Sequence, residues 1–135
     1  MDRHLQRYGY VTARVMLAAI FLLTGYDKLV DVEDAAGDIA GIGLPFPTLL
    51  AVAAGLVEIV CGAFLALGRW TDWAAAGLLL FLVPVTVLMK NPLRADADFG
   101  AFIDFLKNLA IMGGLLLVVL AERCNVGITV QGNAA

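Results

Sequence analysis

The sequence predicts an all-α protein that spans a membrane as a four-helix bundle. Of its 135 residues, 61% are hydrophobic and 16% are charged, whereas soluble domains average about 45–50% apolar and about 25% charged residues. The charged residues are clustered, and the gaps between clusters are about 20 residues long, which is the length of a transmembrane helix. None of these gaps alternates in polarity as a membrane strand would. Backbone groups in lipid must form their hydrogen bonds within their own segment, so each gap is predicted to be a helix.

Four apolar runs mark the predicted spanning helices, which we place at residues 8–30, 48–68, 72–90 and 100–121. The basic residues Arg3 and Arg7 precede the first run, but no small-residue cleavage site follows it. We therefore expect an uncleaved helix rather than a signal peptide. Within the third run, Pro84 cannot donate a hydrogen bond to the carbonyl of Leu80, so we expect a packing kink there. We expect residues 1–135 to form a single domain.

The longest connection, residues 31–47, is acidic and ends in two prolines. In its middle, apolar residues recur at helical spacing and predict a short amphipathic helix on the membrane surface. Pro45 and Pro47 then end that helix and begin the next one, because proline is tolerated at a helix start but not inside a helix. The apolar positions of the short helix are Val32, Ala35, Ile39 and Ile42.

Basic residues in short loops predict the orientation in the membrane. With four spans both termini lie on one side, and the ends on that side carry four basic residues against three at the other ends. We therefore expect both termini to be cytoplasmic. The four are Arg3, Arg7, Arg69 and Arg123, and the three are Lys28, Lys90 and Arg94. Trp70 and Trp73 flank the turn at residues 69–72 and are expected at headgroup depth.

Ionisable residues inside the spans are the candidate functional site. An unpaired charge at the bilayer centre costs about 2.5–3.5 kcal/mol on insertion scales, so such residues face a partner or a cavity. At a rise of about 1.5 Å per residue, Glu58 lies near mid-membrane, within reach of Arg14 and Lys107. We therefore predict a buried network of these three side chains, converging from the first, second and fourth helices.

A second charged pair is predicted nearer the outer boundary, where Lys28 and Asp104 fall at similar depth. Asn108 lies beside the polar face of the fourth helix. Three roles remain open for these residues: ion pairs that fix helix register, a polar pocket for a quinone-like or other small ligand, and a proton or ion path. In a ligand pocket, Glu58 and Lys107 would bond the ligand's oxygens. The apolar walls would be Phe21, Phe81 and Phe105.

Several other classes of function are disfavoured by composition. A net charge of −3 argues against a nucleic-acid partner, because phosphate neutralisation needs a basic face. Cys61 and Cys124 form no C-x-x-C pair, and we interpret both as ordinary small residues. His4 is the single histidine and has no second histidine with which to share a metal, so no metal site is expected. The carboxylates of residues 31–47 are expected to be solvated.

The order and spacing of several short motifs resemble the DoxX family of four-helix bacterial membrane proteins. The first helix ends in Gly25-Tyr26-Asp27-Lys28-Leu29, which resembles the family's Gly-x-x-Lys-Leu signature, and Gly43-Leu44-Pro45 precedes the second helix. Further similarities are the central Glu58 followed by Gly62, then Leu67-Gly68-Arg69, then the run Asp104-Phe105-Leu106-Lys107-Asn108-Leu109-Ala110. The resemblance covers nearly the whole chain.

The resemblance implies a multi-pass protein of the bacterial inner membrane, associated with redox chemistry. Some relatives act as small subunits of a thiosulfate:quinone oxidoreductase, and others are linked to resistance against oxidative stress and quinones. The expected function is a membrane subunit of a redox system that binds quinone or another lipophilic ligand, with catalysis by a soluble or membrane partner. The alternatives are a structural or assembly subunit and a small transporter or proton pathway. Ala110, Gly113 and Gly114 offer a surface for homo-oligomerisation.

Overall fold

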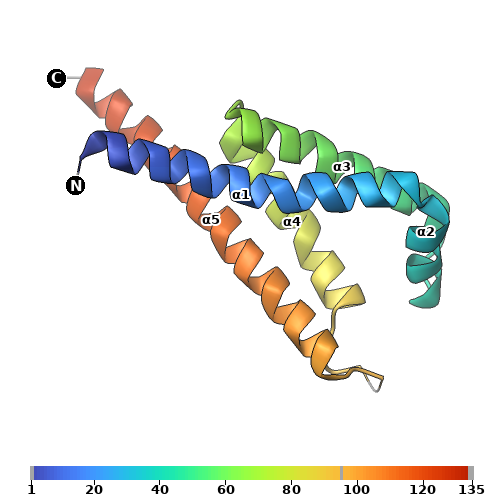
Figure 1. Ribbon diagram of the computed structural model, residues 1–135. Coiled ribbons are helices and arrows are strands. Elements are labelled where there is room, and N and C mark those ends of the chain that lie inside the picture. The colour runs from blue at the N-terminus through green and yellow to red at the C-terminus, as the bar shows by residue number, and fades with distance from the viewer. Residues whose placement is uncertain (1, 95, 134–135) are drawn as a thin grey trace.

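The described part of the chain folds into five helices, shown in Figure 1. The computed structural model describes residues 2–94 and 96–133, with side chains described up to Cys124. The helices are α1 (Arg3–Val30), α2 (Val32–Gly41), α3 (Pro47–Leu67), α4 (Thr71–Met89) and α5 (Phe99–Asn133), and no strand occurs in the described residues. Four of them, α1, α3, α4 and the Phe99–Cys124 part of α5, are long and apolar enough to cross a membrane. The predicted all-α membrane fold is confirmed.

The helix ends that face short connections lie within one residue of the predicted positions, but two free ends do not. α1 begins at Arg3 rather than residue 8, and α5 continues to Asn133 rather than ending at residue 121. A helix need not stop where the apolar run stops, because its backbone hydrogen bonds persist in water. At about 1.5 Å per residue, both helices exceed the roughly 30 Å hydrocarbon core. Both therefore extend beyond the bilayer.

The acidic connection forms α2, as the apolar spacing predicted. The Asp31 side chain accepts a hydrogen bond from the Asp34 backbone N–H at 3.1 Å and so caps the first turn. Ile39 is the buried residue of this helix, and α2 packs mainly against α3. The chain then turns through Gly43, at φ +82°, and Pro47 begins α3.

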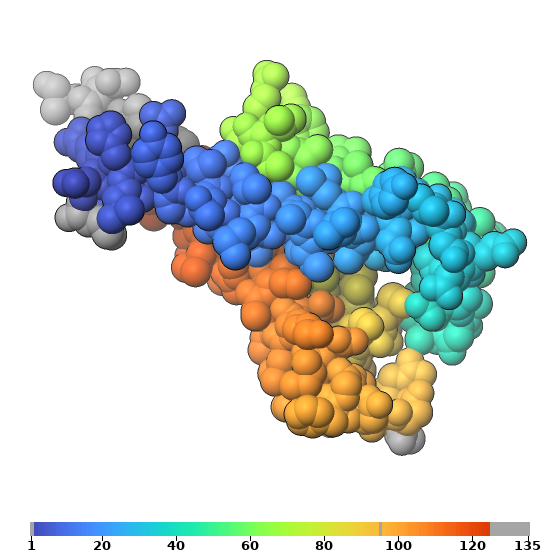
Figure 2. Space-filling model, in the orientation of Figure 1, coloured from blue at the N-terminus to red at the C-terminus, as the bar shows by residue number. Residues whose placement is uncertain are grey.

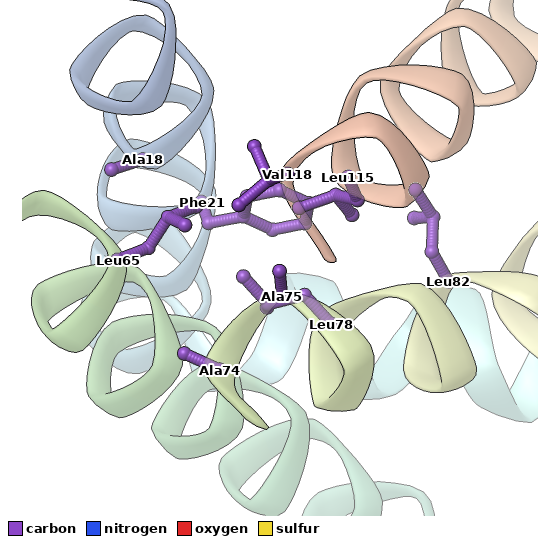
Figure 3. Packing of buried hydrophobic residues seen from close by; sticks show 9 residues of the cluster. All are labelled: Ala18, Phe21, Leu65, Ala74, Ala75, Leu78, Leu82, Leu115 and Val118. Atoms are coloured by element: carbon purple, nitrogen blue, oxygen red, sulfur yellow. The ribbon is translucent and has the colours of Figure 1, made fainter. Parts of the chain in front are cut away.

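The spanning helices associate as two pairs. α1 packs along α3, α4 packs against α5, and the two pairs cross and then diverge (Figure 1). The hydrophobic core lies at the crossing and receives side chains from all four helices (Figure 3). Its buried members are Ala18, Phe21, Leu65, Ala74, Ala75, Leu78, Leu82, Leu115 and Val118.

Two glycines allow α1 and α3 to approach closely. A Cβ atom added at Gly25 would lie 2.9 Å from the Gly55 carbonyl oxygen, and one added at Gly55 would lie 3.2 Å from the Gly25 carbonyl oxygen. A side chain at either position would therefore push the two backbones apart. Small residues at such crossings are characteristic of membrane helix pairs.

Candidate functional site

Glu58 is the buried charged residue at the centre of the α1–α3 contact, with 4% of its surface exposed. Its carboxylate accepts a hydrogen bond from Thr24 Oγ1 at 3.0 Å. Lys28 Nζ donates to both carboxylate oxygens, at 3.1 and 3.0 Å. Thr24 and Lys28 lie one turn apart on α1, so both face the same side of α3. The buried negative charge is thereby paired and fully hydrogen-bonded.

The predicted network of Glu58 with Arg14 and Lys107 is wrong, because Lys28 is the cation that reaches Glu58. The depth of each residue in the membrane was counted from its position along the helix, and this count placed Lys28 at the outer boundary, too far from Glu58. Side chains on a helix lean toward its N-terminus, however, and this direction carries the Lys28 ammonium back into the membrane, toward Thr24. The Gly25–Gly55 crossing brings α3 close enough for the contact.

The predicted pair of Lys28 with Asp104 is also wrong. Asp104 instead accepts from Lys90, at the end of α4, at 3.1 Å, and lies 3.5 Å from Lys107, one turn along α5. The Asp104 and Lys107 side chains are 42% and 68% exposed, so this cluster lies at the surface. The ion pair forms with the cation that is nearest in space. Because α4 packs against α5, Lys90 rather than Lys28 lies beside Asp104.

The remaining two candidate residues lie apart from both clusters. Asn108 donates from Nδ2 to the buried Thr86 Oγ1 at 3.2 Å and so joins α5 to α4. The Arg14 guanidinium lies 5.6 Å from the Tyr10 ring centre, near the end of α3. The six candidate residues therefore do not converge on one interior site. Thr24 and Lys90, which complete two of the clusters, were absent from the predicted site, although Thr24 precedes Lys28 at the i−4 position.

A cavity of about 280 Å³ adjoins the buried ion pair and includes Lys28 in its lining. The cavity lies between the C-terminal end of α1 and the helices α2, α3 and α4. On this side of the molecule, the space-filling surface is hollowed beside α2 (Figure 2). Four aspartates around the α1–α2 junction and Lys28 line one part, and apolar side chains line the rest. The aspartates are Asp27, Asp31, Asp34 and Asp38, and the α4 residues are Phe81, Pro84, Val85, Leu88 and Met89.

This arrangement combines a lysine anchor and an acidic rim with the apolar walls that α3 and α4 provide. An ammonium carries three N–H donors, and Glu58 Oε1 and Oε2 occupy two of the three on Lys28. One donor is left for an acceptor atom in the cavity. Of the three aromatic residues expected as walls, Phe81 lines the cavity, Phe21 lies in the core, and Phe105 is not part of the lining.

The two thiols lie in separate places. Cys61 is half-buried in α3 and Cys124 is exposed on α5, and both are free. In the part of the chain that the structure describes, no group of three or more histidine, cysteine, aspartate or glutamate side chains is arranged to hold a metal ion.

Comparison with known proteins agrees with this architecture. The DoxX family profile matches residues 9–91, which span α1 to α4 and end before the Asp104–Ala110 motif. The chain is 26% identical to the inner membrane protein YphA of Escherichia coli over 110 residues, covering 80% of this chain and 79% of that protein. It is 36% identical to the uncharacterized membrane protein Rv3486 of Mycobacterium tuberculosis over 81 residues, covering 59% of this chain and 50% of that protein.

No solved structure matches the fold. The four apolar helices and the inner-membrane relative support a multi-pass protein of the bacterial inner membrane. Because the family profile covers more than half of its length, the chain belongs to the DoxX family.

Proposed function

We propose that this protein is a membrane subunit that binds a small lipophilic ligand of the quinone class beside Lys28, while a partner protein carries out catalysis. The observation that supports this proposal is the cavity of about 280 Å³ that Lys28 shares with the apolar side chains of α4. Small-molecule sites are typically concave and apolar, with a few polar groups that orient the ligand. A quinone has this composition, since its carbonyl oxygens accept hydrogen bonds and its ring is apolar.

The roles of the individual residues follow from their contacts. Lys28 would donate its remaining N–H to a ligand carbonyl, and Glu58, through its two hydrogen bonds, would hold the ammonium in place. Phe81 and Val85 would contact the ring. Cys61 and Cys124 are far apart in the chain and both are free, so they do not form a redox-active thiol pair. The proposal therefore assigns the redox chemistry to a partner protein.

Filling the cavity is expected to abolish ligand binding without disturbing the ion pair. Ala54 lines the cavity on α3, so Ala54→Phe places a ring in the space that the ligand would occupy. We expect saturable binding of decylubiquinone to the wild-type protein in lipid nanodiscs, measured by calorimetry, and at least tenfold weaker binding to Ala54→Phe. The matched control is Leu80→Phe, at a position on α4 that is 76% exposed and outside the cavity lining.

Equal affinity of wild type and Ala54→Phe, or no saturable binding to either, would contradict the proposal. Protein purified from its native membrane offers a second readout, namely organic extraction followed by mass spectrometry of isoprenoid quinones. A register-fixing role for the Lys28–Glu58 pair predicts no quinone in the extract.

We also propose that both termini are cytoplasmic. Tyr10 donates a hydrogen bond to Glu122 at 2.6 Å, so the terminal parts of α1 and α5 lie at the same end of the molecule (Figure 1). This end carries the arginine-rich segments that the positive-inside rule assigns to the cytoplasm.

Cysteine labelling tests this orientation. In a Cys61→Ala background, the exposed Cys124 is expected to resist a membrane-impermeant maleimide in intact spheroplasts and to react after lysis. In the same background with Cys124→Ser, Leu93→Cys, at a site that is 90% exposed in the α4–α5 connection, should react in intact spheroplasts. The reverse labelling pattern would invert the orientation.

A further inference from the structure

The cations at the two ends of the molecule differ in how they are paired. At the end with α2, the four cations Lys28, Lys90, Arg94 and Lys107 each form an ion pair with a carboxylate. The described ion pairs include none of the five arginines toward the terminal end. These are Arg3, Arg7, Arg14, Arg69 and Arg123. The same end carries three acidic residues, Asp2, Asp72 and Glu122. The five arginines outnumber them, so the end is net positive and attracts anions from outside the chain.

Arg14 occupies a defined place among these arginines. Its guanidinium lies against Gly68, the left-handed residue at φ +76° that ends α3; a Cβ atom added at Gly68 would lie 2.6 Å from Arg14 Nη2. The Tyr10 ring lies 5.6 Å away on α1. Arg14 Nε is buried and has no hydrogen-bond partner within the described residues. The absence of a side chain at Gly68 thus leaves room for a guanidinium at the negative end of the α3 dipole.

The surroundings place Arg14 at headgroup depth rather than inside the hydrocarbon. It lies level with the end of α3, and residues 3–13 of α1 extend beyond that level. The α3–α4 turn follows Gly68 directly and contains Arg69, and the neighbouring Trp70 and Trp73 are 69% and 70% exposed. Tryptophan is enriched where apolar and polar layers of a bilayer meet, so lipid phosphates are available beside Arg14 and Arg69.

We propose that Arg14 and Arg69 form a binding site for the phosphate of an anionic phospholipid at the end of α3. Guanidinium groups match phosphate oxygens in a forked geometry, and basic pockets between membrane helices are suited to anionic headgroups. This site lies at the opposite end of α3 from the Lys28 cavity, so it is independent of the ligand proposed there. The tryptophans would contact the glycerol and upper acyl region of the same lipid.

Native mass spectrometry of the full chain in detergent tests this proposal, with titrations of phosphatidylglycerol and of phosphatidylcholine that has the same acyl chains. We expect the wild type to bind phosphatidylglycerol more tightly, and both Arg14→Gln and Arg69→Gln to weaken that binding by roughly fivefold or more, because a basic residue near a charged bilayer surface contributes about 1 kcal/mol. Arg69→Gln keeps the test open if Arg14→Gln fails to fold. Arg94→Gln is the matched control, since it removes one guanidinium at the other end.

Three results would overturn the lipid site: equal affinity for the two lipids, unchanged phosphatidylglycerol binding in both Arg14→Gln and Arg69→Gln, or an equal loss in Arg94→Gln. A further arm replaces the lipid with millimolar inorganic phosphate. If phosphate alone binds and displaces phosphatidylglycerol, the ligand is a soluble anion and the assignment to lipid is wrong. If it does neither, the lipid is supported as the source of the phosphate group.

Discussion

Lys28→Met is expected to lower the free energy of unfolding by about 3–5 kcal/mol, because removal of one partner leaves the other charge buried and uncompensated. The charge left behind is Glu58, which is 4% exposed and would keep only the hydrogen bond from Thr24. Reversible unfolding in mixed detergent micelles measures this loss. Lys107→Met is the matched control, since the Lys107 side chain is 68% exposed and its loss should cost less than about 1 kcal/mol.

The double variant Lys28→Met/Glu58→Gln separates the structural role of the ion pair from its role in binding. With both charges removed, the stability should return toward that of the wild type, since buried ion pairs can often be replaced by uncharged residues at little net cost. If quinone binds in the cavity without contacting Lys28, this variant should bind it as tightly as the wild type does. The proposed function predicts that it folds but binds no quinone. A double variant as unstable as Lys28→Met would show that the buried carboxylate is not the cause of the loss.

Gly25→Ala is expected to be the other strongly destabilising change, with a loss of about 1–3 kcal/mol from overpacking. The new methyl group would lie 2.9 Å from the Gly55 carbonyl oxygen and 2.8 Å from a side-chain carbon of Ile59. To relieve this contact, α1 must move away from α3, which lengthens the Lys28–Glu58 bonds as well. Unfolding in mixed micelles again gives the measurement.

Gly113→Ala provides a control with the same chemical change and the opposite expectation. Gly113 lies inside α5, and nothing lies within 4 Å of an added Cβ atom. Alanine is favoured over glycine in a helix by about 0.8–1.0 kcal/mol, so this variant should be as stable as the wild type or slightly more so. A Gly25→Ala protein as stable as Gly113→Ala would contradict the close α1–α3 crossing.

The helices could be predicted from the sequence because they depend on local composition. An apolar run of about 20 residues has few options in lipid other than a helix, and the amphipathic spacing of residues 32–42 was sufficient to predict α2. The outward extensions of α1 and α5 were missed because hydrophobicity marks where a helix enters the membrane and not where it ends.

The candidate site was predicted in part, because sequence spacing shows which face a residue occupies but not which helix meets that face. The importance of Glu58 followed from the cost of a buried charge. Its partner did not, since the choice among Arg14, Lys28 and Lys107 depends on where α1 crosses α3 and on the direction in which a lysine side chain leans. The cavity beside Lys28 was not visible in the sequence, because four elements from separate parts of the chain form it.

The amino-acid order by itself determined that this protein enters a membrane, how many times it crosses and which buried carboxylate needs a cation. These properties follow from transfer free energies that each segment carries alone. Only the packed helices decided that Lys28 provides that cation, that Lys90 pairs with Asp104, and that Arg14 lies beside the end of α3. Such choices depend on distances between segments that are far apart in the chain. The close contact of Gly25 with Gly55 sets one of these distances, between α1 and α3.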